Sequence, residues 1–312
     1  MSCKLLMISF ATIIAGVCFS VQAQEATKKP DGAPVVKLID AGASPKSKLR
    51  MTPAKGSKQT SIMTMKMDQA IVMSGQKLPA TPTPAMQFTM EVAVTDVATN
   101  GDFAFEFSYP KASLVDDDNV QAAVKEAMKG MLKSMVGMSG SAVVSNRGFT
   151  KEADMKLPPK VNAQIKAMID GMKESMSRLS SPLPEEPIGV GGKWSVTQLV
   201  EANGMKLTQT SIHTLNKLEG AKYDISIEVT QTAEPQEVKT PGLPEGSTVT
   251  LESLESTGKG TMMLDVTRVF PVSEIKSDSK ISMEMNTGGQ DLSMQIDMKM
   301  EMSIGPAKAG EE

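Results

Sequence analysis

Methionine supplies the most distinctive chemistry in this sequence. The chain has 26 methionines among 312 residues, and several stand at every second position, as in MTMKM (63–67) and MKMEM (298–302). A thioether sulfur is a soft ligand that suits Cu(I), and the same side chain is an unbranched, adaptable apolar group. Three uses of these residues therefore compete: filler of an ordinary core, lining of an adaptable apolar cavity, and ligands of a copper site.

Spacing along the chain weakens the copper interpretation. The segment LSMQIDMKMEMSI (292–304) alternates apolar and polar residues, which predicts a strand with one buried and one wet face. Neighbours on one face of a strand lie about 6.8 Å apart, too far to share a metal without an adjacent strand. ISMEM (281–285) is the candidate neighbour, through Met283 and Met285. We favour a filled core or an adaptable cavity over copper.

No other motif predicts a reaction. His213 is the single histidine, and we expect a surface or half-buried strand residue. GMSGS (137–141) ends in serine where a nucleophile elbow needs glycine. Asp116–Asp118 are best explained as a helix N-cap, and GVGGKW (189–194) as a flexible entry to a strand, since phosphate loops lead into helices. We expect no enzyme, no metal site and no cofactor.

The N-terminus predicts export. Residues 1–23 combine Lys4, an apolar run and the small-residue sequence VQA before Gln24, which is the pattern of a cleaved signal peptide. A lipoprotein signal with lipidated Cys18 is the alternative. Both cysteines, Cys3 and Cys18, lie in this segment, so the mature chain has no thiol or disulfide. We expect a periplasmic or extracellular protein of the cell envelope, with no transmembrane segment after cleavage.

Charge excludes one class of partner. The chain has 36 acidic and 33 basic residues and no basic block with interleaved aromatics, so we expect no nucleic-acid binding. A lipid or an apolar envelope partner fits the composition better.

Strand patterns dominate after a linker at 24–47, in which only VVKLI (35–39) suggests a weak edge strand. Alternation recurs at 61–68, 86–94, 223–229 and many other places, with turn signals between them. We expect a mainly β fold of the α+β class: a large curved antiparallel sheet or half-barrel of about twelve strands. The domain would span 48–304, followed by a flexible tail at 305–312.

Helical spacing interrupts the strands. Apolar residues fall at helical intervals over 120–136 and 161–179, within an insertion at about 114–180. We expect two amphipathic helices packed on the apolar face of the sheet. The candidate cavity would then be lined by methionines of the second helix and of the last two strands: Met168, Met172, Met176, Met283, Met285, Met294, Met298 and Met300.

The order of elements resembles two groups of proteins. The motifs GGKW, GAKYDISIEV and GKGTMMLDV are similar to those of uncharacterised exported bacterial β-rich families. A long-stranded sheet with Met- and Ile-rich helices also resembles the half-barrel of Lol-type lipoprotein carriers. That resemblance implies acyl chains held between a curved sheet and a helical lid.

These expectations converge on a non-enzymatic, exported, methionine-rich protein that binds a hydrophobic ligand or apolar partner between sheet and helix. The alternative is a structural or interaction module of the envelope with a filled methionine core and no small ligand. A methionine-based Cu(I)-binding protein is the third possibility.

Overall fold

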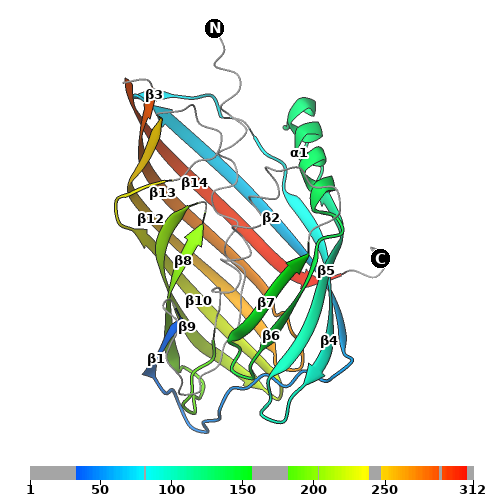
Figure 1. Ribbon diagram of the computed structural model, residues 1–312. Coiled ribbons are helices and arrows are strands. Elements are labelled where there is room, and N and C mark those ends of the chain that lie inside the picture. Colours follow the sequence, from blue (N-terminus) through cyan, green and yellow to red (C-terminus); the bar gives the residue numbers. More distant parts are fainter. Residues whose placement is uncertain are drawn as a thin grey trace.

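Fourteen antiparallel strands form one large curved sheet (Figure 1). This computed structural model describes residues 33–80, 82–156, 182–202, 204–238, 247–287 and 290–307. The main order of strands is β1-β8-β9-β10-β12-β13-β14-β2-β4-β5-β6-β7, while β11 pairs with β12 and β3 with β2. The predicted mainly β fold with a curved antiparallel sheet is confirmed, with fourteen strands in place of about twelve. Within the described residues β1 and β7 are its two ends, so the sheet is open.

The elements run along the chain as follows: β1 (Val35–Asp40), β2 (Lys58–Met73), β3 (Gln76–Lys77), β4 (Met86–Val97), β5 (Phe103–Leu114), α1 (Ala122–Met135), β6 (Ser139–Val144), β7 (Thr150–Lys156), β8 (Lys193–Ala202), β9 (Met205–Glu219), β10 (Lys222–Ala233), β11 (Gln236–Glu237), β12 (Thr248–Asp265), β13 (Val272–Thr287) and β14 (Gln290–Pro306). The apolar piece expected at 35–39 is strand β1, which pairs with β8 at the edge of the sheet.

Alternation along the strands separates a buried inner face from a wet outer one. On β14 every second residue from Met294 to Ile304 is buried, and the residues between them are exposed or partly exposed. Outer positions carry cross-strand ion pairs, such as Lys276 Nζ with Glu301 Oε1 at 3.4 Å and Lys259 Nζ with Glu228 Oε1 at 3.4 Å. Exposed pairs of this kind contribute little stability, but they mark the face that water contacts.

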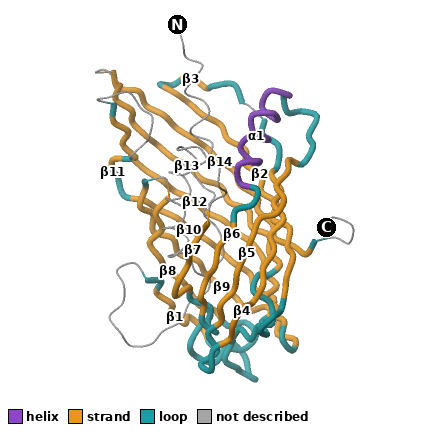
Figure 2. Tube along the Cα trace, turned by 45° about the vertical axis from the view of Figure 1, so that its right-hand side comes forward, coloured by secondary structure: helices purple, strands orange, loops and turns teal. Residues whose placement is uncertain are grey.

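Helix α1 packs on the inner face near one end of the sheet. Leu132 is buried against Met86 and Phe88 of β4, and Figure 2 shows the helix at the end opposite the main group of loops. The helix is capped at Gln121, with no side-chain cap hydrogen bond. The expected N-cap role of Asp116–Asp118 is therefore wrong; Asp116 instead accepts a hydrogen bond from Lys125 Nζ at 2.7 Å. The helix predicted at 161–179 lies outside the described residues.

Two large groups of buried residues divide the inner face. The first, called here the aromatic cluster, joins both arms of the sheet: Leu49, Met51, Met90, Val92, Val94, Phe103, Phe105, Phe107, Val144, Leu183, Ile188, Trp194, Val196, Leu215, Tyr223, Ile225, Ile227, Val229, Met262, Leu264, Val266 and Val269. Because its members come from β4–β6 as well as β8–β12, the two arms pack against each other at this end.

The second group, called here the methionine cluster, lies along strands β8 to β14 and has no aromatic member: Val200, Met205, Leu207, Val238, Val249, Leu251, Leu254, Ile281, Met283, Met285, Met294, Ile296, Met298 and Met300. Methionines and an isoleucine of β2 pack beside it. The two ends of one sheet therefore have cores of different chemistry.

Candidate functional site

The five predicted site residues on the last two strands lie together. Met283, Met285, Met294, Met298 and Met300 are each 4% exposed or less and belong to the methionine cluster. They face inward because they occupy alternate positions of β13 and β14. The other three predicted residues, Met168, Met172 and Met176, lie outside the described residues.

The pairing of strands brings methionines from three strands into one row. Met294 of β14 stands opposite Met283 of β13 on one side and Met73 of β2 on the other. Residues directly opposite in antiparallel strands have Cβ atoms about 4.5–5.5 Å apart, so long flexible side chains from this row can meet. Met300 likewise faces Met67, whereas Met285 faces Leu292. Strand β2 is thus a methionine-bearing neighbour that local alternation did not identify.

His213 lies inside the aromatic cluster end of the sheet, fully buried at 1% exposure. The expectation of a surface or half-buried residue is wrong. Its ring stacks on Trp194 with centroids 5.0 Å apart and planes 9° from parallel, and its Nε2 lies 2.9 Å from Ser211 Oγ. Burial lowers the pKa of His213 to about 4. The ring is therefore neutral near pH 7, which suits a packed structural residue.

Three cations converge on one carboxylate beside the aromatic cluster. Glu185 pairs with Lys48 at 3.1 Å, with Arg50 at 3.0 Å and with Arg147 at 3.0 Å. Burial raises the pKa of Glu185, but the hydrogen bond from Lys48 and the charges of both arginines outweigh it and lower that pKa. Arg147 Nε also donates to Leu183 O at 3.1 Å. This network ties the segment before β8 to the turn between β6 and β7.

Two glycines of GVGGKW, Gly189 and Gly192, are tightly packed, so the expected flexible entry to the strand is wrong. A Cβ on Gly189 would lie 1.7 Å from Ala43 O, and one on Gly192 would lie 2.1 Å from Ile188 Cγ1. Gly189 N also donates to Ala41 O at 2.9 Å. The loop is a close-packed joint between β8 and the segment after β1. Lack of space explains Gly189 and Gly192, and a positive φ of 83° explains Gly191.

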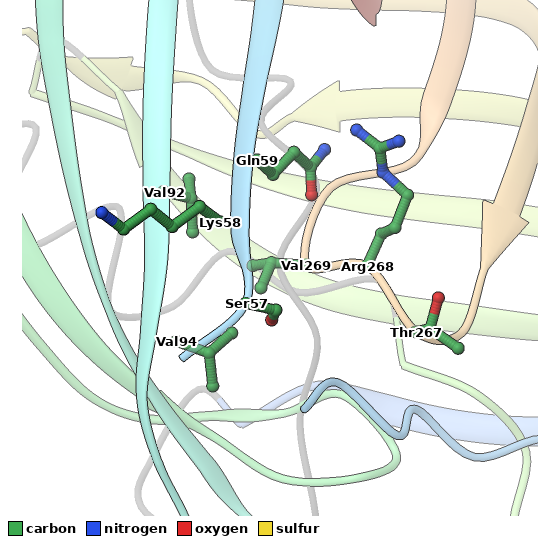
Figure 3. A pocket seen from close by; sticks show the side chains of 8 residues that line it. All are labelled: Ser57, Lys58, Gln59, Val92, Val94, Thr267, Arg268 and Val269. Carbon is green, nitrogen blue, oxygen red and sulfur yellow. The ribbon is translucent and has the colours of Figure 1, made fainter. Parts of the chain in front are cut away.

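A small cavity lies near the start of β2 (Figure 3), with a volume of ≈ 30 Å³. Gln59 clamps the turn after β12 beside it: its Nε2 donates to Phe270 O at 2.9 Å, and Phe270 N donates to its Oε1 at 3.2 Å. The space is enough for a water molecule or two and far too small for an acyl chain. Its lining consists of Ser57, Lys58, Gln59, Val92, Val94, Thr267, Arg268 and Val269.

Sequence reasoning missed a set of polar residues on the inner face. Gln209, Ser211 and His213 of β9 are buried, although they stand in register with Leu207 and Leu215. The signal was present in the sequence: within MKLTQTSIHTL the inward positions of the alternation change from apolar to polar and back. Gln231 of β10 shows the same departure.

Comparison with known proteins gives a partial match to one family model and no activity. Residues 160–271 match the model of a family of unknown function, DUF6263. The match covers less than half of the chain and includes strands β8 to β12, whereas the methionine-bearing β13, β14 and β2 lie outside it. It is consistent with the expected uncharacterised family. No curated protein matches the chain.

The structural comparison supplies one neighbour of very low similarity. A structure titled "Asymmetric conductivity of engineered proteins" shares 9% identity over 78% of this chain and 100% of the other, with a TM-score of 0.15, which carries no argument. The resemblance to Lol-type carriers receives no support from these comparisons. Among the described residues, no helix is long and apolar enough to cross a membrane.

Proposed function

We propose that this protein is an exported, non-enzymatic envelope protein that binds a hydrophobic ligand, a lipid or acyl chain, on the methionine cluster of its curved sheet. The observation that carries the proposal is the contrast within one inner face. One end contains aromatic rings from both arms of the sheet, and the other is lined by aliphatic side chains, among them six methionines.

Methionine suits such a surface for a physical reason. Its three rotatable bonds and polarizable sulfur let it repack around partners of different shape, which is why methionine is common on promiscuous binding surfaces. Strands ordinarily favour β-branched and aromatic residues, so a methionine-bearing strand face departs from the usual preference. An adaptable lining explains that departure, while a purely structural core does not require it.

The test is a triple substitution, Met294→Leu, Met298→Leu and Met300→Leu, measured for stability and for binding of the apolar fluorescent probe N-phenyl-1-naphthylamine. Leucine has similar volume and stiffer rotamers, so the free energy of unfolding should change by less than about 1.5 kcal/mol. Probe affinity should fall, because stiff side chains adapt less well. The matched control is Met51→Leu, Met90→Leu and Met262→Leu in the aromatic cluster, which should leave probe affinity unchanged.

Failure of this test has a definite meaning. If the parent protein binds no probe, or if the triple variant binds it as the parent does, the carrier proposal is wrong. The alternative, a structural or interaction module with a filled methionine core, then stands.

Cu(I) binding is a second candidate, favoured by the row Met73–Met294–Met283 across three adjacent strands. Three thioethers are a plausible donor set for Cu(I). Titration of the reduced protein with Cu(I) against a chelator tests it. Binding that disappears in Met294→Leu would support copper, since leucine has no lone pair to offer, and absence of binding by the parent would exclude it.

Export is tested by sequencing the N-terminus of the mature protein, which we expect to begin at Gln24. An acylated Cys18 would show instead that the protein is a membrane-anchored lipoprotein.

A further inference from the structure

A row of uncharged polar side chains crosses the inner face of the sheet. Strand register places Gln198 opposite Gln209, Gln209 opposite Gln231, Gln231 opposite Ser256, and Ser256 opposite Ser279. The five residues come from five consecutive strands, β8, β9, β10, β12 and β13. All are buried, with exposures of 4–7%. We call this set the polar row.

The row separates the two clusters. Along β9 the inward residues pass from Leu207 in the methionine cluster, through Gln209, to Leu215 in the aromatic cluster. Along β12 they pass from Leu254 in the methionine cluster, through Ser256, to Met262 in the aromatic cluster. The polar row therefore lies where the methionine-lined part of the inner face ends.

Hydrogen bonds link members of the polar row but do not use all of their donors and acceptors. Gln231 Nε2 donates to Gln209 Oε1 at 2.7 Å, and Ser279 Oγ donates to Ser256 Oγ at 2.8 Å. A primary amide has two N–H donors and a two-lone-pair acceptor, so Gln209 and Gln231 have donor or acceptor capacity beyond this single bond. Burying polar groups costs free energy that leucines at the same positions would not cost. Ligand recognition is a reason to keep them.

Charge decides which ligand such a row can accept. Of the buried residues that the structure describes, only Arg147 carries a fixed charge, and it lies in the turn between β6 and β7. His213, the nearest buried base along β9, is neutral near pH 7 because burial holds its pKa at about 4. An anionic or cationic head group would thus be desolvated at the row without a counter-charge, which is costly. An ester, amide or hydroxyl could bond to amides and hydroxyls.

We propose that the polar row recognises the uncharged polar group of an amphipathic lipid whose hydrocarbon chain lies on the methionine cluster. This inference rests on the proposed function and narrows its ligand to neutral lipids such as acylglycerols or acyl amides. The row sets the depth at which the polar group stops, because the aromatic cluster beyond it is closed by packing between the two arms of the sheet.

The experiment compares ligands of one chain length on the full mature protein. Monopalmitoylglycerol, palmitate and hexadecyltrimethylammonium, each below its critical micelle concentration, compete with bound N-phenyl-1-naphthylamine. The parent should bind monopalmitoylglycerol about tenfold more tightly than either charged ligand, a ratio that corresponds to one or two hydrogen bonds. The double variant Gln209→Leu/Gln231→Leu removes both members of the bonded pair, and its preference should fall to about one with probe affinity retained.

Two controls keep the outcomes distinct. Gln295→Leu makes the same change on the exposed face of β14 and should preserve the preference. Ser256→Ala/Ser279→Ala, a smaller change in volume, serves if the leucine variant does not fold, and should also reduce the preference. A parent that binds the probe but shows no preference for the neutral lipid, or a preference that survives both row variants, overturns this inference alone. A parent that binds no probe overturns it together with the proposed function.

Discussion

The aromatic end and the methionine end of this sheet bury their inner faces in different ways. At the aromatic end, rings stack and cross at fixed angles: Phe105 and Phe270 are edge-to-face at 79°, while Trp194 and His213 lie parallel. Gly140 makes room for the ring of Phe107, since a Cβ there would lie 2.4 Å from Cζ. The methionine cluster has no aromatic member among the described residues.

We infer from this difference that a single sheet can separate stability from adaptability. Complementary packing of aromatic rings at one end stabilises the fold. The other end can then use side chains that specify structure poorly but accommodate a variable partner. Three measurements test this division of roles.

The largest effect should come from Trp194→Ala. The indole is 1% exposed and its Nε1 donates to Pro182 O at 3.0 Å. Truncation leaves a large cavity in a rigid surround and should cost about 3–5 kcal/mol of unfolding free energy. Met283→Ala, equally buried, should cost about 2 kcal/mol, the low end of its class, because neighbouring methionines can move into the space. Urea unfolding followed by circular dichroism measures both, and equal losses would contradict the proposed difference in rigidity.

The next largest effect on stability should come from lowering the pH. Because the pKa of His213 is about 4 in the folded protein and about 6.5 when unfolded, the unfolded chain binds the proton first as pH falls. Stability should be unaffected above about pH 6.5 and should fall by roughly 2–3 kcal/mol between there and pH 4.5. His213→Phe/Ser211→Ala keeps a ring beside Trp194 and removes the titrating group. Carboxylates titrate in both proteins, so the difference between the two pH profiles isolates His213; identical profiles would mean that the imidazole is not desolvated.

The smallest effect should come from a reciprocal exchange. Leu215, 0% exposed in the aromatic cluster, changed to Met should cost about 1 kcal/mol, because a flexible side chain fits a rigid site less well. Met283→Leu should be neutral or slightly stabilising, since its neighbours adapt. Thermal unfolding of the two variants shows whether each substitution raises or lowers stability. A stabilising Leu215→Met would show that the aromatic end is not the more precisely packed one.

Alternation identified much of this sheet from the sequence, because one wet and one buried face impose a period of two. The inward direction of Met283, Met294 and Met298 followed from that period alone. The pairing of the strands could not be predicted from this period. Nothing local indicates that β14 lies beside β2, because pairing between distant segments depends on the packing of the whole sheet.

The candidate site was predictable only in part for a related reason. Apolar inward residues were recognised as a face, but Gln209 and Gln231 have no local motif, and their meaning appears only when register places them side by side. The packing of Gly189 against Ala43 depends likewise on contact between segments far apart in the chain. A glycine in a sequence is usually read as a sign of backbone flexibility, but at position 189 it is present because a side chain would not fit.

The pairing of β14 with β2 also affects when this molecule can fold during its synthesis. Ser61 of β2 pairs with Pro306 of β14, so β2 is synthesised long before its partner strand. Until then the inward methionines of β2 and one edge of that strand stay exposed, a state prone to aggregation. Contacts between such distant segments also slow folding. The nascent chain should therefore depend on a holding chaperone until β14 has been synthesised.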